Sequence, residues 1–149
     1  MKLEKIVEIV RIKQVIQEVE GHERYVIRSP HDAAKLAADY IGDEDREVFL
    51  VMALNTKNQV IAVHRAHIGS INASIVSPRE VFKVCILNNA TNVIVSHNHP
   101  SGDSFRSPED LQVTKRLVEC GKYLGIEVLD HVIVTDSDEF YSMKESGDM

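Results

Sequence analysis

Two histidines and a carboxylate stand close together in residues 96–110 and could hold one metal ion. His97 and His99 are separated by one residue, and in an extended segment residues i and i+2 point to the same side. Asp110 stands at the start of a predicted helix, where a turn can bring its carboxylate back to the pair. Two imidazoles and one carboxylate form a three-ligand zinc set that leaves a fourth position open for water. The spacing therefore predicts a catalytic rather than a structural zinc site.

Asp110 and Ser107 also have a purely structural interpretation. Residues 107–110 read Ser-Pro-Glu-Asp, the pattern of a capping box in which Ser107 caps a helix and Asp110 is its acidic partner. An acidic residue in the first turn also suits the helix dipole. Taken alone, Asp110 is better explained as a capping residue, but the two nearby histidines reverse that preference. Ser107 could cap the helix only, or could also direct its hydroxyl or neighbouring N–H groups at an oxyanion.

A zinc hydrolase also needs a general base, which residues 96–110 do not supply because ligated histidines cannot serve. Two glutamates elsewhere are candidates. Glu80 is already explained as the acidic partner of Ser77 at a second predicted helix start. Glu47 begins an apolar run, where a carboxylate is harder to explain. The sequence gives Glu47 a modest preference.

The elements that must position these residues alternate between strands and helices. Strands are predicted over residues 47–54, 59–68, 92–96, 128–135 and 140–143, and helices over 32–41, 77–88 and 107–124. This order predicts an α/β or mixed α+β domain in which helices cover a central sheet. The apolar strand at 92–96 would deliver the two histidines to its carboxyl end, where open α/β sheets place their ligands.

Composition excludes several classes of protein. The chain of 149 residues fits one domain, and its net charge of −6 with no long basic run argues against tight, non-specific DNA binding. Its two cysteines, Cys85 and Cys120, lie in apolar stretches and are expected to be reduced core thiols. Since charged residues interrupt every apolar run, we expect a cytoplasmic protein with no signal peptide and no membrane partner.

The spaced motifs resemble a known enzyme family. His97-x-His99, seven residues, Ser107, two residues and Asp110 match the JAMM (MPN+) metalloprotease signature, and Glu47-Val48-Phe49 is similar to its upstream Glu-x-Phe. The sequence resembles the bacterial RadC (JAB) family more closely. That likeness covers residues 28–147, and its motifs lie at 77–82, 97–103, 107–110 and 129–133.

The resemblance implies a deaminase-like three-layer α/β/α fold with a central mixed sheet, the JAB1/MPN domain. It implies zinc held by His97, His99 and Asp110, with Glu47 as the acid/base that activates water and Ser107 stabilising the tetrahedral intermediate. The implied function is a metallopeptidase or isopeptidase acting on a peptide or protein substrate. The alternative is a RadC-type protein of DNA repair or recombination whose metal domain is not a peptidase. Nucleobase deamination is set aside because the chain has no Cys-x-x-Cys.

Residues 1–27 are expected to form an N-terminal extension, with β-strands, ahead of the RadC-like JAB/MPN domain at 28–149. The extension could add strands, cover the site or mediate a homodimer. Longer RadC proteins carry a helix-hairpin-helix region there, and its lack would weaken the DNA-repair alternative. In the strand at 128–135, Asp130 and His131 are expected to form a buried, hydrogen-bonded pair that supports the fold. A role in orienting a metal ligand is the less favoured interpretation.

Overall fold

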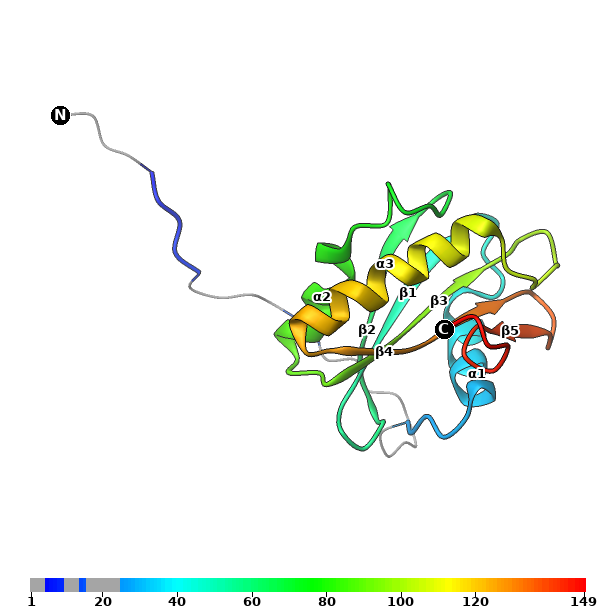
Figure 1. Cartoon of the computed structure of the whole chain (residues 1–149), viewed down its shortest axis with the longest axis horizontal. Coiled ribbons are helices and arrows are strands. Elements are labelled where there is room, and N and C mark those ends of the chain that lie inside the picture. Colours follow the sequence, from blue (N-terminus) through cyan, green and yellow to red (C-terminus); the bar gives the residue numbers. More distant parts are fainter. Residues whose placement is uncertain (1–4, 10–13, 16–24) are drawn as a thin grey trace.

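The computed structural model describes residues 5–9, 14–15 and 25–149. Its elements in chain order are α1 (Pro30–Ile41), β1 (Val48–Leu54), β2 (Val60–Ile68), α2 (Pro78–Leu87), β3 (Asn92–Asn98), α3 (Pro108–Leu124), β4 (Glu127–Val134) and β5 (Phe140–Ser142) (Figure 1). Most of the extension at residues 1–27 lies outside the described residues, so its predicted strands stay a prediction. Within the described part of the chain, no helix is long and apolar enough to cross a membrane.

The described strands form a five-stranded sheet in the order β2-β1-β3-β4-β5. The central strand pairing is mixed, since β1 and β3 are antiparallel whereas β3 and β4 are parallel. The two outer pairs, β1 with β2 and β4 with β5, are antiparallel. Parallel neighbours need a crossover connection, and α3 provides it between β3 and β4. This crossover places the start of α3 at the same sheet edge as the end of β3.

Helices cover both faces of the sheet, so β1 is buried along its whole length. Phe49 and Val51 of β1 face the core that is shared with α2 and α3. Leu50 and Met52 face the opposite core, which is shared with α1. Figure 1 shows the same arrangement, with α1 on one side of the sheet and α2 and α3 on the other. The predicted three-layer α/β/α fold with a mixed sheet is confirmed.

A serine followed by proline begins each of the three described helices, but only two of the serines act as caps. Ser29 and Ser107 each accept a hydrogen bond from the backbone N–H three residues later. Ser77 makes no such bond, so the capping box predicted between Ser77 and Glu80 is wrong. Instead, Glu80 pairs with Lys83, one turn along α2, at 2.8 Å. The ion pair with Lys83 lowers the pKa of Glu80.

Two glycines shape the turn from α3 into β4. Gly125 ends α3 with a φ of +73°, a left-handed conformation that glycine adopts without steric cost. Gly121, one turn earlier, accepts a hydrogen bond of 3.0 Å from the backbone N–H of Ile126. A Cβ at Gly121 would collide with the Ile126 carbonyl oxygen. The chain can therefore enter β4 tightly against the last turns of α3.

Both cysteines are free, as predicted. Cys85 is fully buried in the core beneath α2, and Cys120 of α3 packs against the same core. Burial raises the pKa of the Cys85 thiol to about 12, so this thiol stays protonated at neutral pH. Cys85 therefore behaves as a small apolar core residue.

Candidate metal centre

The candidate metal centre lies at the carboxyl end of β3. The strand runs to Asn98, two residues beyond its predicted end, so His97 is still part of the sheet. In the register, His97 lies between Phe49 of β1 and Ile133 of β4, and it is fully buried. His99 follows the strand and points to the same side, because its Nε2 atom lies 2.9 Å from Nε2 of His97. The predicted convergence of the two imidazoles is present in the structure.

Asp110 faces both imidazoles from the first turn of α3. Its Oδ1 lies 3.1 Å from Nε2 of His97, and its Oδ2 lies 3.3 Å from Nε2 of His99. The same carboxylate closes the capping box, since Oδ2 accepts a 2.7 Å hydrogen bond from the backbone N–H of Ser107. Although burial acts to raise the pKa of Asp110, the contacts with the two histidines dominate and hold it well below its usual range. The structural role and the ligand-like role, weighed as alternatives from the sequence, coexist in one side chain.

Ser107 stands at the rim of this cluster as the N-cap of α3. Its Oγ accepts a 3.1 Å hydrogen bond from the backbone N–H of Asp110. A hydroxyl oxygen that accepts in this way can still donate its own hydrogen to a further group. The residue is half-buried, so its hydroxyl is held in place without being closed off.

The loop after β3 fixes the tautomer of His99. Its Nδ1 lies 2.8 Å from the backbone carbonyl oxygen of Asp103. Because a carbonyl oxygen can only accept, Nδ1 carries the hydrogen, and a neutral His99 presents a bare Nε2 to the cluster. Burial opposes protonation of this ring, but the hydrogen bonds to Asp110 and Asp103 outweigh it and raise the pKa of His99. This ring is therefore arranged to hold a cation or a proton at Nε2.

Glu47 approaches the cluster from the residue before β1. Its carboxylate and the ring nitrogens of His97 and His99 all lie within 4.8 Å of one another. Glu80, the other candidate base, instead forms its ion pair with Lys83 on α2 and is not part of this group. Of the two glutamates that the sequence offered, the structure brings only Glu47 to the histidines.

Asn98 lies between the two histidines in sequence but points to the opposite side, where it holds the segment that carries Glu47. Its Oδ1 accepts a 2.7 Å hydrogen bond from the backbone N–H of Val48. Its Nδ2 donates to the backbone carbonyls of Glu44 and Arg46, at 3.2 and 2.9 Å. Three hydrogen bonds from one fully buried amide thus fix the backbone on both sides of Glu47. Sequence reasoning missed this role.

The donor set fits a zinc ion. Ligand atoms at about 2.0–2.1 Å from one tetrahedral zinc lie about 3.3 Å from one another. The nitrogens of His97 and His99 are 2.9 Å apart, and the nearest oxygens of Asp110 are 3.1 and 3.3 Å from them. A bare imidazole nitrogen is repelled by a second one and by a carboxylate at such distances, so a cation among them is favourable. The Glu47 carboxylate, within 4.8 Å of both imidazole nitrogens, is a further oxygen donor beside the same centre.

Asp130 and His131 are both buried and joined by a hydrogen bond, as predicted, but their side chains have different further partners. The Asp130 carboxylate accepts hydrogen bonds from the Ser142 hydroxyl and from the backbone N–H groups of His131 and Lys144, at 2.6, 2.8 and 3.1 Å. Burial raises the pKa of Asp130, and its partners anchor the C-terminal segment. The His131 ring instead contacts His97, with His131 Nε2 2.7 Å from His97 Nδ1. Burial also lowers the pKa of His131 well below its usual range.

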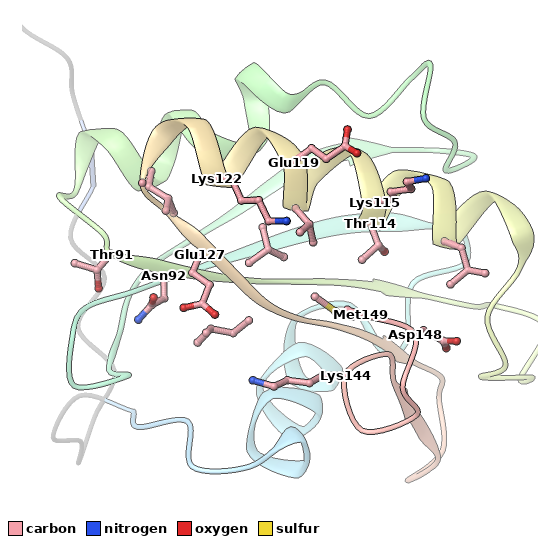
Figure 2. Close-up of a pocket in the computed structure, with 17 residues that line it drawn as sticks. Thr91, Asn92, Thr114, Lys115, Glu119, Lys122, Glu127, Lys144, Asp148 and Met149 are labelled. Atoms are coloured by element: carbon pink, nitrogen blue, oxygen red, sulfur yellow. The ribbon is translucent and has the colours of Figure 1, made fainter.

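A large cavity in the described part of the chain is distinct from the candidate metal centre. It measures about 1090 Å³, and α3, β4 and the C-terminal segment contribute side chains to its wall (Figure 2). Lys122 and Lys144 extend into it from different elements, whereas none of His97, His99 and Glu47 lines it. The candidate metal centre therefore lies outside this cavity.

Comparison with known proteins agrees with this architecture. A family model described as RadC-like JAB domain matches residues 27–148. A UPF0758 protein of Geobacillus sp. (strain WCH70) is 49% identical over 146 residues, which are 98% of this chain and 64% of that protein. A UPF0758 protein of Geobacillus thermodenitrificans (strain NG80-2) is 54% identical over 126 residues, 85% of this chain and 55% of that protein. One from Bacillus cereus (strain AH187) is 52% identical over 129 residues, 87% of this chain and 57% of that protein. The chain thus spans less than two thirds of these relatives.

Proposed function

This chain belongs to the RadC-like JAB family, and we propose that it is a zinc-dependent hydrolase that cleaves peptide or isopeptide bonds. One observation carries the proposal: two imidazole nitrogens and a buried carboxylate converge within 3.3 Å, and a second carboxylate, Glu47, faces them. Three convergent ligands with a free carboxylate beside them are typical of a catalytic metal site. A structural zinc site has four protein ligands.

In this proposal, His97, His99 and Asp110 hold the metal. Asp110 is preferred to Glu47 as the third ligand because both of its oxygens contact the histidines and only 2% of the residue is exposed. When bound, zinc supplies Lewis acidity that polarises a carbonyl and lowers the pKa of a coordinated water to ~7. The negative charge of Asp110 and the bare Nε2 of His99 are the groups that such a cation requires.

Glu47 is assigned the proton transfers. One of its carboxylate oxygens accepts a proton from the attacking water and returns it to the nitrogen of the leaving amine. The three hydrogen bonds from Asn98 hold the backbone around Glu47, so its carboxylate is oriented before substrate arrives. The Ser107 hydroxyl, fixed at the N-cap of α3, donates a hydrogen bond to the oxyanion that forms on the substrate carbonyl.

The amide class of substrate is favoured by this division of roles. An amine is a poor leaving group unless it is protonated, and Glu47 is placed to carry the proton from water to nitrogen. The JAB-type resemblance supports the same class, since its signature positions Glu47, Ser107 and Asp110 are all filled here.

Glu47→Gln tests the proposal with a matched control. The zinc-loaded protein is incubated with a peptide library derived from a bacterial proteome, and new amino termini are counted by mass spectrometry. We expect Glu47→Gln to keep its zinc but to lose cleavage by at least about a hundredfold. Glu80→Gln, which removes the other candidate base from the solvent-facing side of α2, should cleave like the wild type. If the zinc-loaded wild type cleaves no more than Glu47→Gln, the proposed hydrolase is refuted.

A further inference from the structure

A chain of buried contacts joins the proposed metal ligand His97 to the ligand-bearing helix α3. Nδ1 of His97 lies 2.7 Å from Nε2 of His131 on the neighbouring strand β4. Nδ1 of His131 lies 2.5 Å from Oγ1 of Thr114, which belongs to α3. The Thr114 hydroxyl in turn donates to the backbone carbonyl of Asp110, one turn earlier, at 2.8 Å. Oδ1 of Asp110 lies 3.1 Å from Nε2 of His97, and this contact closes the chain of contacts.

The hydrogens along this closed chain of contacts can be assigned by starting from Thr114. Thr114 has a single hydroxyl hydrogen, which it donates to the Asp110 carbonyl oxygen. The Met143 sulfur, 3.1 Å from Oγ1, is also only an acceptor, so neither of these partners can donate to Oγ1. Oγ1 therefore accepts from His131, so Nδ1 of His131 carries the hydrogen. A neutral imidazole has one N–H, so Nε2 of His131 is bare and accepts from Nδ1 of His97.

This hydrogen placement also determines the state of Nε2, the nitrogen on the opposite side of the His97 ring. With its hydrogen on Nδ1, a neutral His97 presents a bare Nε2 to Asp110 and His99. That nitrogen is the one that a metal ion would bind. The Asp103 carbonyl sets the same tautomer in His99 through the loop. Both imidazoles are therefore oriented toward the centre by hydrogen bonds from outside it.

We propose that His131 and Thr114 are positioning residues for metal binding, which fix the ring orientation and the Nδ1–H tautomer of His97. The inference rests on the proposed zinc site. Its location supports a dedicated role: His131 is fully buried and Thr114 is 3% exposed, so neither ring nor hydroxyl can exchange these partners for water. Phe49 packs edge-on against the His131 ring at 5.6 Å and near-parallel to the His97 ring at 6.4 Å, which limits rotation of both. Figure 2 shows Thr114 projecting from α3 on the side that faces the sheet.

Two amide variants of His131 give a matched test. The Gln amide reaches about as far as Nε2 of histidine and can still accept from His97, whereas the shorter Asn amide reaches only the Nδ1 position beside Thr114. We expect His131→Asn to bind zinc about 10–100-fold more weakly in a chelator competition, and His131→Gln to remain close to the wild type. Thr114→Val should weaken binding, and Thr114→Ser, which keeps the hydroxyl, should restore it.

The wild-type protein provides a measurement that does not depend on any variant folding. Ring ¹⁵N shifts of the zinc-loaded protein should place hydrogens on Nδ1 of both His97 and His131. A His131 hydrogen on Nε2, or equal zinc affinities for the folded Asn and Gln variants, would overturn the inference. Failure of the wild type to bind zinc at all would instead refute the proposed zinc site, so the two failures are distinguishable.

Discussion

Replacing Asn98 with alanine should separate catalysis from metal binding. The side chain is fully buried and makes three hydrogen bonds, all to the backbone around Glu47. Each such bond contributes about 0.5–1.5 kcal/mol net to stability, and a buried N–H left without a partner, here that of Val48, costs about 1–3 kcal/mol. We therefore expect Asn98→Ala to lower the free energy of unfolding by about 3 kcal/mol, which urea titration would measure.

The effect on activity should exceed the effect on zinc. The Asn98 side chain points away from the imidazoles, so the zinc affinity of the folded variant should stay within about twofold of the wild type. Glu47, however, loses the contacts that orient its backbone, and a misplacement of about 1 Å can lower turnover by about 100-fold. Chelator competition gives the first quantity, and peptide-library cleavage per bound zinc gives the second.

Asn55→Ala is the matched control. Asn55 follows β1 at its other end and also makes three side-chain hydrogen bonds, to Lys57 and Gln59 in the β1–β2 turn. Its replacement should lower stability but leave both zinc affinity and cleavage unchanged. The reasoning fails if Asn98→Ala keeps full activity per bound zinc, or if its zinc affinity falls as far as its turnover.

Two further predictions concern stability. In the presence of a chelator, the free energy of unfolding should fall as the pH rises above 6.5, because the raised pKa of His99 makes the folded state hold a proton that the unfolded state has already released. His99→Gln should remove this slope, and an unchanged slope from pH 6.5 to 8.5 would contradict the assignment. Gly121→Ala should lower stability by about 1–3 kcal/mol despite alanine's better helix propensity, since its Cβ meets the Ile126 carbonyl. A more stable variant in thermal melts would show that α3 can shift away from β4.

The elements of the fold were predictable where local signals were strong. The uninterrupted apolar run of β1 and the Ser-Pro starts of α1, α2 and α3 set their positions within a residue or two. Ser77 shows the limit of such signals. It carries the same pattern as Ser107, yet its hydroxyl forms no capping bond, and the Glu80 carboxylate pairs with Lys83 on the same helix. A capping pattern states which bonds are available, and tertiary context decides which are made.

The residues of the candidate metal centre were predictable for similar reasons, whereas the residues that support them were not. Local sequence shows the spacing of His97 and His99 and the helix start at Asp110. The convergence of these three side chains therefore follows from strand and helix geometry. Asn98 and His131 act across 50 and 34 residues of sequence. Those contacts depend on which strands are neighbours and in what register, which a single sequence does not specify. Adjacency in sequence suggests only the Asp130–His131 pair, whereas successive strand side chains point to opposite faces and so meet different partners.

Locating zinc by anomalous diffraction from a crystal of the zinc-loaded protein would test the central claim most directly. We expect one peak, from a zinc ion bound by Nε2 of His97, Nε2 of His99 and the Asp110 carboxylate, with Glu47 beside the ion but outside its protein ligands. A zinc held by Glu47 in place of Asp110, or a peak away from these histidines, would contradict it.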